Sequence, residues 1–145
     1  KTARDGGAVA RAIAGEIDKV AGKLAGRSEP ELRAIGTQLT TTMVAVKTSI
    51  DWMVRAYGAD PRQAHAGAVA YLKMWGLAVG GWQMGRAALV VADELAAGKG
   101  DAAFQRAKIT TARFYAESLL PQALAFAHSI EHGGESALAL ADEAF

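Results

Sequence analysis

Apolar residues recur at steps of three or four positions along two stretches in the first half of the chain, residues 5–25 and 30–57. This spacing places them on one face of an α-helix, so both stretches are predicted to be amphipathic helices. The second series is the most regular one and is close to the seven-residue repeat of helices that pack side by side. Its members are Leu32, Ile35, Leu39, Met43, Val46, Ile50, Met53 and Tyr57, and those of the first stretch are Val9, Ile13, Ile17, Val20 and Leu24.

A third predicted helix, residues 61–97, is apolar on almost every side at its centre and has no charge between Lys73 and Arg86. A helix of this kind belongs in the middle of a fold. Trp75 and Trp82 are seven residues apart, so they share a face that meets either the core or a partner surface. Four glycines indicate that other helices approach the backbone closely: Gly76, Gly80, Gly81 and Gly85.

Residues 101–132 form the fourth predicted helix, in which Pro121 is expected to bend the axis. Gly133 and Gly134 are expected to end it, and a short tail helix is expected within 135–145. Its apolar band consists of Phe104, Ile109, Ala112, Ala116, Leu119, Ala123, Phe126 and Ile130. Short loops force successive helices to be antiparallel. The predicted fold is therefore all-α, an antiparallel up-down-up-down four-helix bundle with a short C-terminal tail helix, in one domain of residues 1–145.

The starts of these helices carry capping signals. Ser28 is followed three residues later by Glu31, which predicts a reciprocal capping box at the second helix. Asp60 and Gln63 repeat the pattern at the third helix, and Asp101 is expected to cap the fourth.

Composition narrows the classes of function. The 145 residues carry a net charge of +1 with both signs interspersed, which gives no electrostatic case for nucleic acid. The absence of cysteine excludes disulfides and thiolate chemistry and fits a cytoplasmic location. The uncharged run of the third helix is too short for a membrane span, so none is expected. The chain begins with Lys1 rather than Met, and we expect it to be the C-terminal domain of a longer polypeptide.

Few side chains suggest a catalytic or metal-binding role. His128 and His132 are four residues apart beside Glu131, a spacing that can hold a metal, but no facing helix offers matching ligands, so the predicted role is structural. Arg113 and Glu117 are expected to form a salt bridge within their helix. The glycines of the third helix match no phosphate-binding motif. The residues alone therefore predict a helical bundle without a visible catalytic, cofactor or metal site.

Several segments resemble the additional C-terminal domain of flavin-dependent acyl-CoA dehydrogenases, specifically the longer, methylthiopropanoyl-CoA dehydrogenase-like enzymes. The distinctive run is Ala107-Lys108-Ile109-Thr110-Thr111-Ala112-Arg113-Phe114-Tyr115-Ala116-Glu117, followed by Leu120-Pro121-Gln122-Ala123. The segments 1–7, 70–76, 80–82 and 139–145 fit the same pattern, so the resemblance extends over essentially the whole chain.

The resemblance implies an accessory role. In that family the flavin and the acyl-CoA lie in a preceding core, and the catalytic glutamate belongs to a Tyr-Glu-Gly-Thr-Asn-like motif that these 145 residues lack. The resemblance therefore implies FAD and an acyl-CoA substrate for the parent enzyme, with none of their binding residues in this chain. The implied partners are the dehydrogenase core of the same polypeptide and further copies of the protein in a homo-oligomer. The candidate packing or interface residues are Trp75, Gly76, Gly80, Trp82, Arg113, Phe114 and Pro121. The alternative is a free-standing helical scaffold, phasin-like, that binds an apolar surface.

Overall fold

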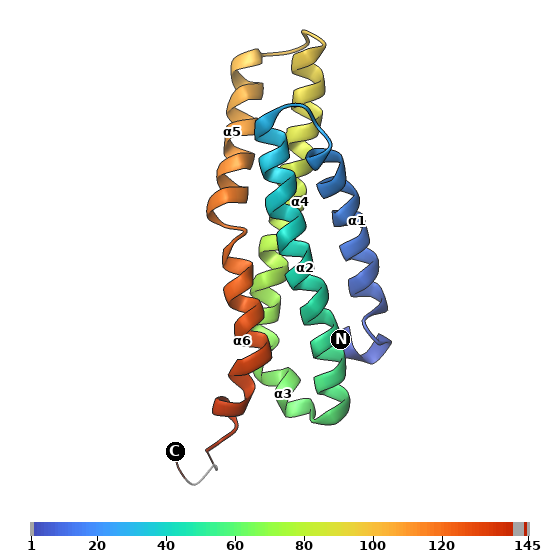
Figure 1. The fold of residues 1–145 in the computed structure, drawn as a ribbon, viewed down its shortest axis with the longest axis vertical. Helices are drawn as coiled ribbons and strands as arrows, with labels where there is room; N and C mark the ends of the chain where they lie inside the picture. Colours follow the sequence, from blue (N-terminus) through green and yellow to red (C-terminus); the bar gives the residue numbers. More distant parts are fainter. Residues whose placement is uncertain (1, 141–143, 145) are drawn as a thin grey trace.

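The computed structural model describes residues 2–140 and 144, and the regular structure within this part of the chain is entirely helical (Figure 1). The predicted all-helical class is therefore confirmed. Helix α2 lies at the centre and contacts every other α-helix, while α5 and α6 follow one another end to end (Figure 1). The elements are η1 (Thr2–Asp5, a 3-10 helix), α1 (Ala8–Ala25), α2 (Pro30–Ala59), α3 (Pro61–Ala66), α4 (Ala68–Ala96), α5 (Ala102–Ser118) and α6 (Gln122–Ala137).

The apolar series of α2 forms the centre of the core. Seven of its eight predicted members are buried, and Tyr57, the eighth, is half-buried. Two threonine hydroxyls of this helix bond back to carbonyls one turn earlier, Thr40 to Gly36 at 2.9 Å and Thr41 to Thr37 at 3.1 Å. Such back-bonding satisfies these hydroxyl groups within the helix, as their position in a helix interior predicts.

Helix α1 differs from its predicted form. It begins at Ala8 rather than Asp5, because η1 and the left-handed Gly6 and Gly7 come first. Val9 and Ile13, members of the predicted apolar face, are 62% and 40% exposed, and the face buried against α2 is built mainly of alanines. Alanine allows a shorter distance between two helices than a branched side chain does.

The predicted third helix is divided in two. Gly67 separates the short α3 from α4, and the two helices point in different directions (Figure 1). A Cβ at Gly67 would lie 3.4 Å from the carbonyl oxygen of Ile130, so the glycine lets α6 pass close to the joint.

The predicted fourth helix is also divided, at residues 119–121. Pro121 has no N–H to donate, and the amides that follow bond three residues back, with Gln122 N–H reaching Leu119 O at 3.1 Å. The expected bend is therefore a break, which turns Leu120 into the core. Phe104, predicted to be apolar core, is 56% exposed near the start of α5.

The end of α6 also differs from its predicted form. Gly133 and Gly134 do not stop the helix, which continues to Ala137. Residues 138–140 are turn and bend rather than the predicted tail helix, and residues 141–143 and 145 of that prediction lie outside the described residues.

The predicted capping residue is correct at two of three helix starts, but the reciprocal bond predicted for Gln63 is not formed, because Asp60 N–H donates to Ala56 O at 2.8 Å. The Asp60 carboxylate accepts from Arg62 N–H at 3.0 Å, and the Asp101 carboxylate accepts from Ala103 N–H at 2.8 Å. The capping box predicted for Ser28 and Glu31 is wrong, because Glu29 is the residue that precedes α2 and makes no side-chain cap.

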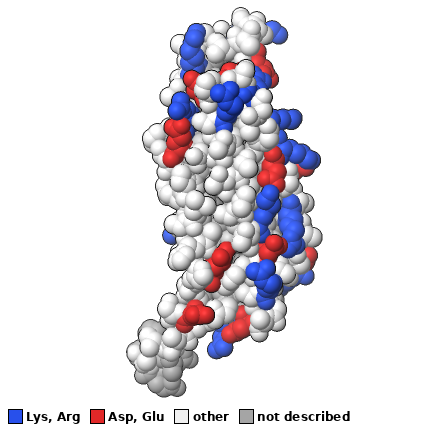
Figure 2. Space-filling model, viewed as in Figure 1, with Lys and Arg blue, Asp and Glu red and all other residues white. Residues whose placement is uncertain are grey.

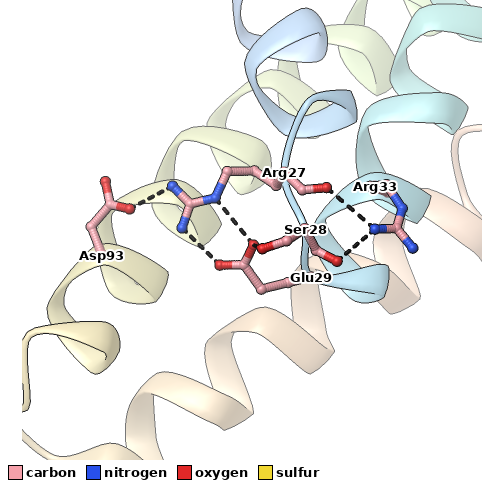
Figure 3. A network of polar contacts seen from close by, with 5 residues as sticks. All are labelled: Arg27, Ser28, Glu29, Arg33 and Asp93. Carbon is pink, nitrogen blue, oxygen red and sulfur yellow. Dashed lines mark hydrogen bonds and ion pairs between the residues drawn. The ribbon is translucent and has the colours of Figure 1, made fainter.

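Glu29 instead belongs to an ionic network around the α1–α2 loop (Figure 3). Arg27 donates to Glu29 at 2.8 Å and to Asp93 of α4 at 2.6 Å. The hydrogen bond from Arg27 lowers the pKa of Glu29 to about 2, and backbone and Ser28 hydrogen bonds act in the same direction. The network ties this end of α1 to α4.

Candidate functional site

An apolar groove of about 550 Å³ lies between α1 and α4, at the end of the molecule where the chain begins. Its floor is formed by α2 and α3, and η1 closes one edge. Two aliphatic side chains along the groove are mostly exposed: Leu72 is 73% exposed and Val9 is 62% exposed. The larger apolar and aromatic side chains that line it are Val9, Ile13, Met53, Tyr57, Tyr71, Leu72 and Trp75.

Few polar groups reach this groove. The Asp5 carboxylate accepts from Gly7 N–H at 2.9 Å and so serves the turn between η1 and α1. The His65 ring meets Tyr57 edge-on at 6.1 Å, and Tyr71 meets Trp75 in the same way at 6.3 Å. The Tyr71 hydroxyl is buried and has no hydrogen-bond partner among the described residues. The groove can bind an apolar surface, but it holds no arrangement of groups suited to catalysis.

Charged residues are concentrated elsewhere. Figure 2 shows Lys, Arg, Asp and Glu gathered along the α1 side and around the end where α1 joins α2, with an uncharged region beside them. Two ion pairs cross from α1 to α2: Arg11 to Asp51 at 2.6 Å and Lys47 to Asp18 at 2.9 Å. One side of α1 is therefore charged and the side facing the groove is apolar.

Of the two tryptophans expected to share a role, only Trp75 lines the groove. Trp82 lies one heptad further along α4 and is half-buried, with Arg86 5.5 Å from its ring centre. Its ring nitrogen is buried without a partner among the described residues. The shared helix face therefore does not produce one shared site.

The four glycines of α4 also have different surroundings. Cβ atoms at Gly81 and Gly85 would each come within 2.8 Å of a leucine side chain, Leu120 and Leu24 respectively. A Cβ at Gly80 would overlap the Tyr115 hydroxyl, which donates to Leu77 O at 3.2 Å.

Gly76 is the exception. A Cβ there would meet nothing within 4 Å, so no described helix packs against it. It lies exposed on α4 next to Trp75 of the groove.

The remaining candidates lie apart from the groove. Arg113 and Glu117 form the predicted salt bridge at 2.7 Å, and the hydrogen bond that Arg113 donates to Glu117 raises the pKa of Arg113. Phe114 is 62% exposed on α5, and Pro121 is exposed at the break before α6. These residues are not brought together into one site by the fold.

The rings of His128 and His132 on α6 lie with their centres 4.6 Å apart and their planes tilted by 42°. Among the described residues, no group of three or more His, Asp or Glu side chains could hold a metal ion. Over the same residues, no helix has the length and apolarity needed to cross a membrane.

The groove was not predicted from the sequence, because Val9 and Ile13 share an apolar helix face with Ile17 and Leu24, which are buried. The signal was present in α1, where Ala10, Ala14 and Ala21 widen this apolar stripe. A stripe wider than the contact with the neighbouring helix leaves part of its apolar surface uncovered.

Comparisons with known proteins indicate the same family as the resemblance found in the sequence. Residues 12–141 match a family model described as acetyl-CoA dehydrogenase C-terminal like. The chain is 36% identical over 138 residues to a 3-methylmercaptopropionyl-CoA dehydrogenase of Ruegeria pomeroyi. That match covers 95% of this chain but only 23% of the relative, so the chain spans about a quarter of the relative's length.

Proposed function

The chain belongs to the acetyl-CoA dehydrogenase C-terminal-like family, and on this premise we propose that it is the accessory domain of an FAD-dependent acyl-CoA dehydrogenase. The parent enzyme would oxidise acyl-CoA thioesters to α,β-unsaturated products. The observation that carries the proposal is the family match across residues 12–141, in a chain that aligns with only part of a much longer dehydrogenase.

In this proposal the domain serves docking and assembly rather than chemistry. It packs on the preceding dehydrogenase core of the same polypeptide and supports a homo-oligomer. The exposed aliphatic side chains of α1 and α4 support this role, because apolar residues gathered around a groove are typical of interaction surfaces. We also propose that the helices form an antiparallel four-helix bundle of α1, α2, α3–α4 and α5–α6.

FAD and the acyl-CoA would be bound by the core. Gly80, Gly81 and Gly85 of α4 face side chains of other helices, so the backbone at these three glycines is not open to a flavin pyrophosphate. We therefore assign no step of the reaction to these residues.

A truncation tests the proposal. The full-length protein and a version that ends before Lys1 are purified, and their flavin content, thermal unfolding and mass in solution are compared. Both should carry flavin, and the truncated protein should unfold at a lower temperature or form a smaller assembly. Full-length protein without flavin, or a truncation with unchanged stability and mass, would refute the accessory role.

A further inference from the structure

The groove between α1 and α4 indicates which face of the domain meets the rest of the enzyme. Resting on the proposed function, we propose that the polypeptide preceding Lys1 packs into this groove, so that η1, α1 and α4 form the docking face.

The first support is the chemistry of the groove. Val9, Ile13 and Leu72 are 62%, 40% and 73% exposed, and they lie on two different helices around the same hollow. Aliphatic side chains in such a cluster are stabilised when another apolar surface covers them, by roughly 1.5–3 kcal/mol for each one fully buried.

The second support is where the chain enters. Thr2, Ala3 and Asp5 of η1 line the groove themselves, so the polypeptide that precedes them emerges at its edge. In the curated relative about three quarters of the length lies outside the matched region, and the family model describes a C-terminal part. A segment tethered this closely has a high effective concentration at the groove, whereas a separate molecule must reach it by diffusion.

The third support is the distribution of charge around α1. On the side away from the groove, Arg11 and Lys47 pair with carboxylates across the α1–α2 contact. On the groove side, the charged lining residue is Asp5, whose carboxylate already accepts from Gly7 and Val9 N–H. Helix α1 therefore presents its charges to solvent and its aliphatic side chains to the proposed core.

The fourth support is that α1 and α4 are tied together at one end only. Arg27 binds Asp93 and ties α4 to the loop after α1, at the end of the pair far from the groove. At the other end the two helices are separated by the hollow rather than by packed side chains. A partner inserted there would complete the contact between the two helices.

The experiment is limited trypsin digestion of the full-length protein, measuring cleavage after Arg4 in η1. Leu72→Glu should increase this cleavage rate by about tenfold to a hundredfold, because the undocked population rises when a buried leucine contact is lost. Val90→Glu is the matched control: Val90 is a similarly exposed aliphatic residue (57%) on the same helix, outside the groove, and its variant should be cleaved at the native rate. Circular dichroism checks that both variants stay helical.

A photocrosslinking amino acid at position 72, with position 90 as the control, gives an independent readout. Crosslinks from position 72 to residues preceding Lys1 of the same polypeptide support the proposal. Crosslinks only between two copies, or none, overturn it in favour of a dimer surface or an uncovered groove.

The experiments distinguish a failure of the docking-face proposal from a failure of the accessory-domain proposal. Full-length protein that carries flavin but shows equal cleavage rates for Leu72→Glu and Val90→Glu overturns the docking face and leaves the accessory role intact. Full-length protein without a flavin-binding core overturns both.

Discussion

Replacing Gly36 by alanine should destabilise the domain even though alanine is the better helix former. Gly36 lies in α2 where that helix meets α1. A Cβ there would come within 2.9 Å of Ala21 O and Ala25 Cα and would overlap the backbone nitrogen of Ala25. These are backbone atoms of α1, so no side chain can rotate away to relieve the contact.

The expected magnitude is the difference between two terms. Alanine gains about 0.5–1 kcal/mol over glycine in a helix interior. Forcing an extra methyl group into a packed contact costs roughly 1–3 kcal/mol, and here α1 must move away from α2 as a whole. The net loss should be about 1–2 kcal/mol, which for a domain of this size lowers the melting temperature by roughly 3–8 °C.

Thermal unfolding of the 145-residue chain, followed by circular dichroism, measures the effect. Gly22→Ala on α1 is the matched control, because a Cβ at Gly22 would meet nothing within 4 Å and the variant should melt slightly higher. If Gly36→Ala also melts higher, α1 and α2 are not in the close contact described here, and the reasoning is refuted.

Three further changes have expected outcomes. Asp101→Ala should lower the stability by about 1 kcal/mol in urea denaturation, because the carboxylate caps α5 through Ala103 and Phe104 N–H; an unchanged midpoint would contradict the cap. Gly76→Ala should stabilise the isolated domain by about 0.5–1 kcal/mol, since its Cβ enters open space, and a loss of stability would mean that the space is filled. Glu29→Gln tests the ionic network through pH: a pKa lowered from 4.5 to about 2 contributes stability that is complete above pH 4.5 and lost as the pH falls towards 2. The stability difference between the native protein and Glu29→Gln should therefore shrink over that interval, and a constant difference would contradict the network.

The sequence predicted the parts of the fold that depend on local pattern. The heptad-like series of α2 identified the core because seven of its eight positions are buried. Asp60 and Asp101 were recognisable as caps because a carboxylate at that position satisfies free N–H groups without help from distant residues.

The parts that depend on neighbouring helices were not predictable in the same way. Gly67 divides a helix, whereas Gly133 does not, although both are glycines in apolar stretches, so a glycine in the sequence does not by itself predict a helix break. Val9 follows the apolar period yet lies outside the core, because alanines already fill the α1–α2 contact. The groove arises because aliphatic side chains of α1 are left uncovered, and its position depends on how α1 lies against α4. That arrangement is not readable from the sequence alone.

The assignment of this domain to an acyl-CoA dehydrogenase is tested by the visible absorption spectrum of the full-length protein, recorded without oxygen before and after an acyl-CoA is added. We expect a flavin band that the acyl-CoA bleaches, because electrons pass from the thioester to FAD in the core. A full-length protein without a flavin band, or with a band that no acyl-CoA bleaches, would contradict the assignment of this domain to an acyl-CoA dehydrogenase.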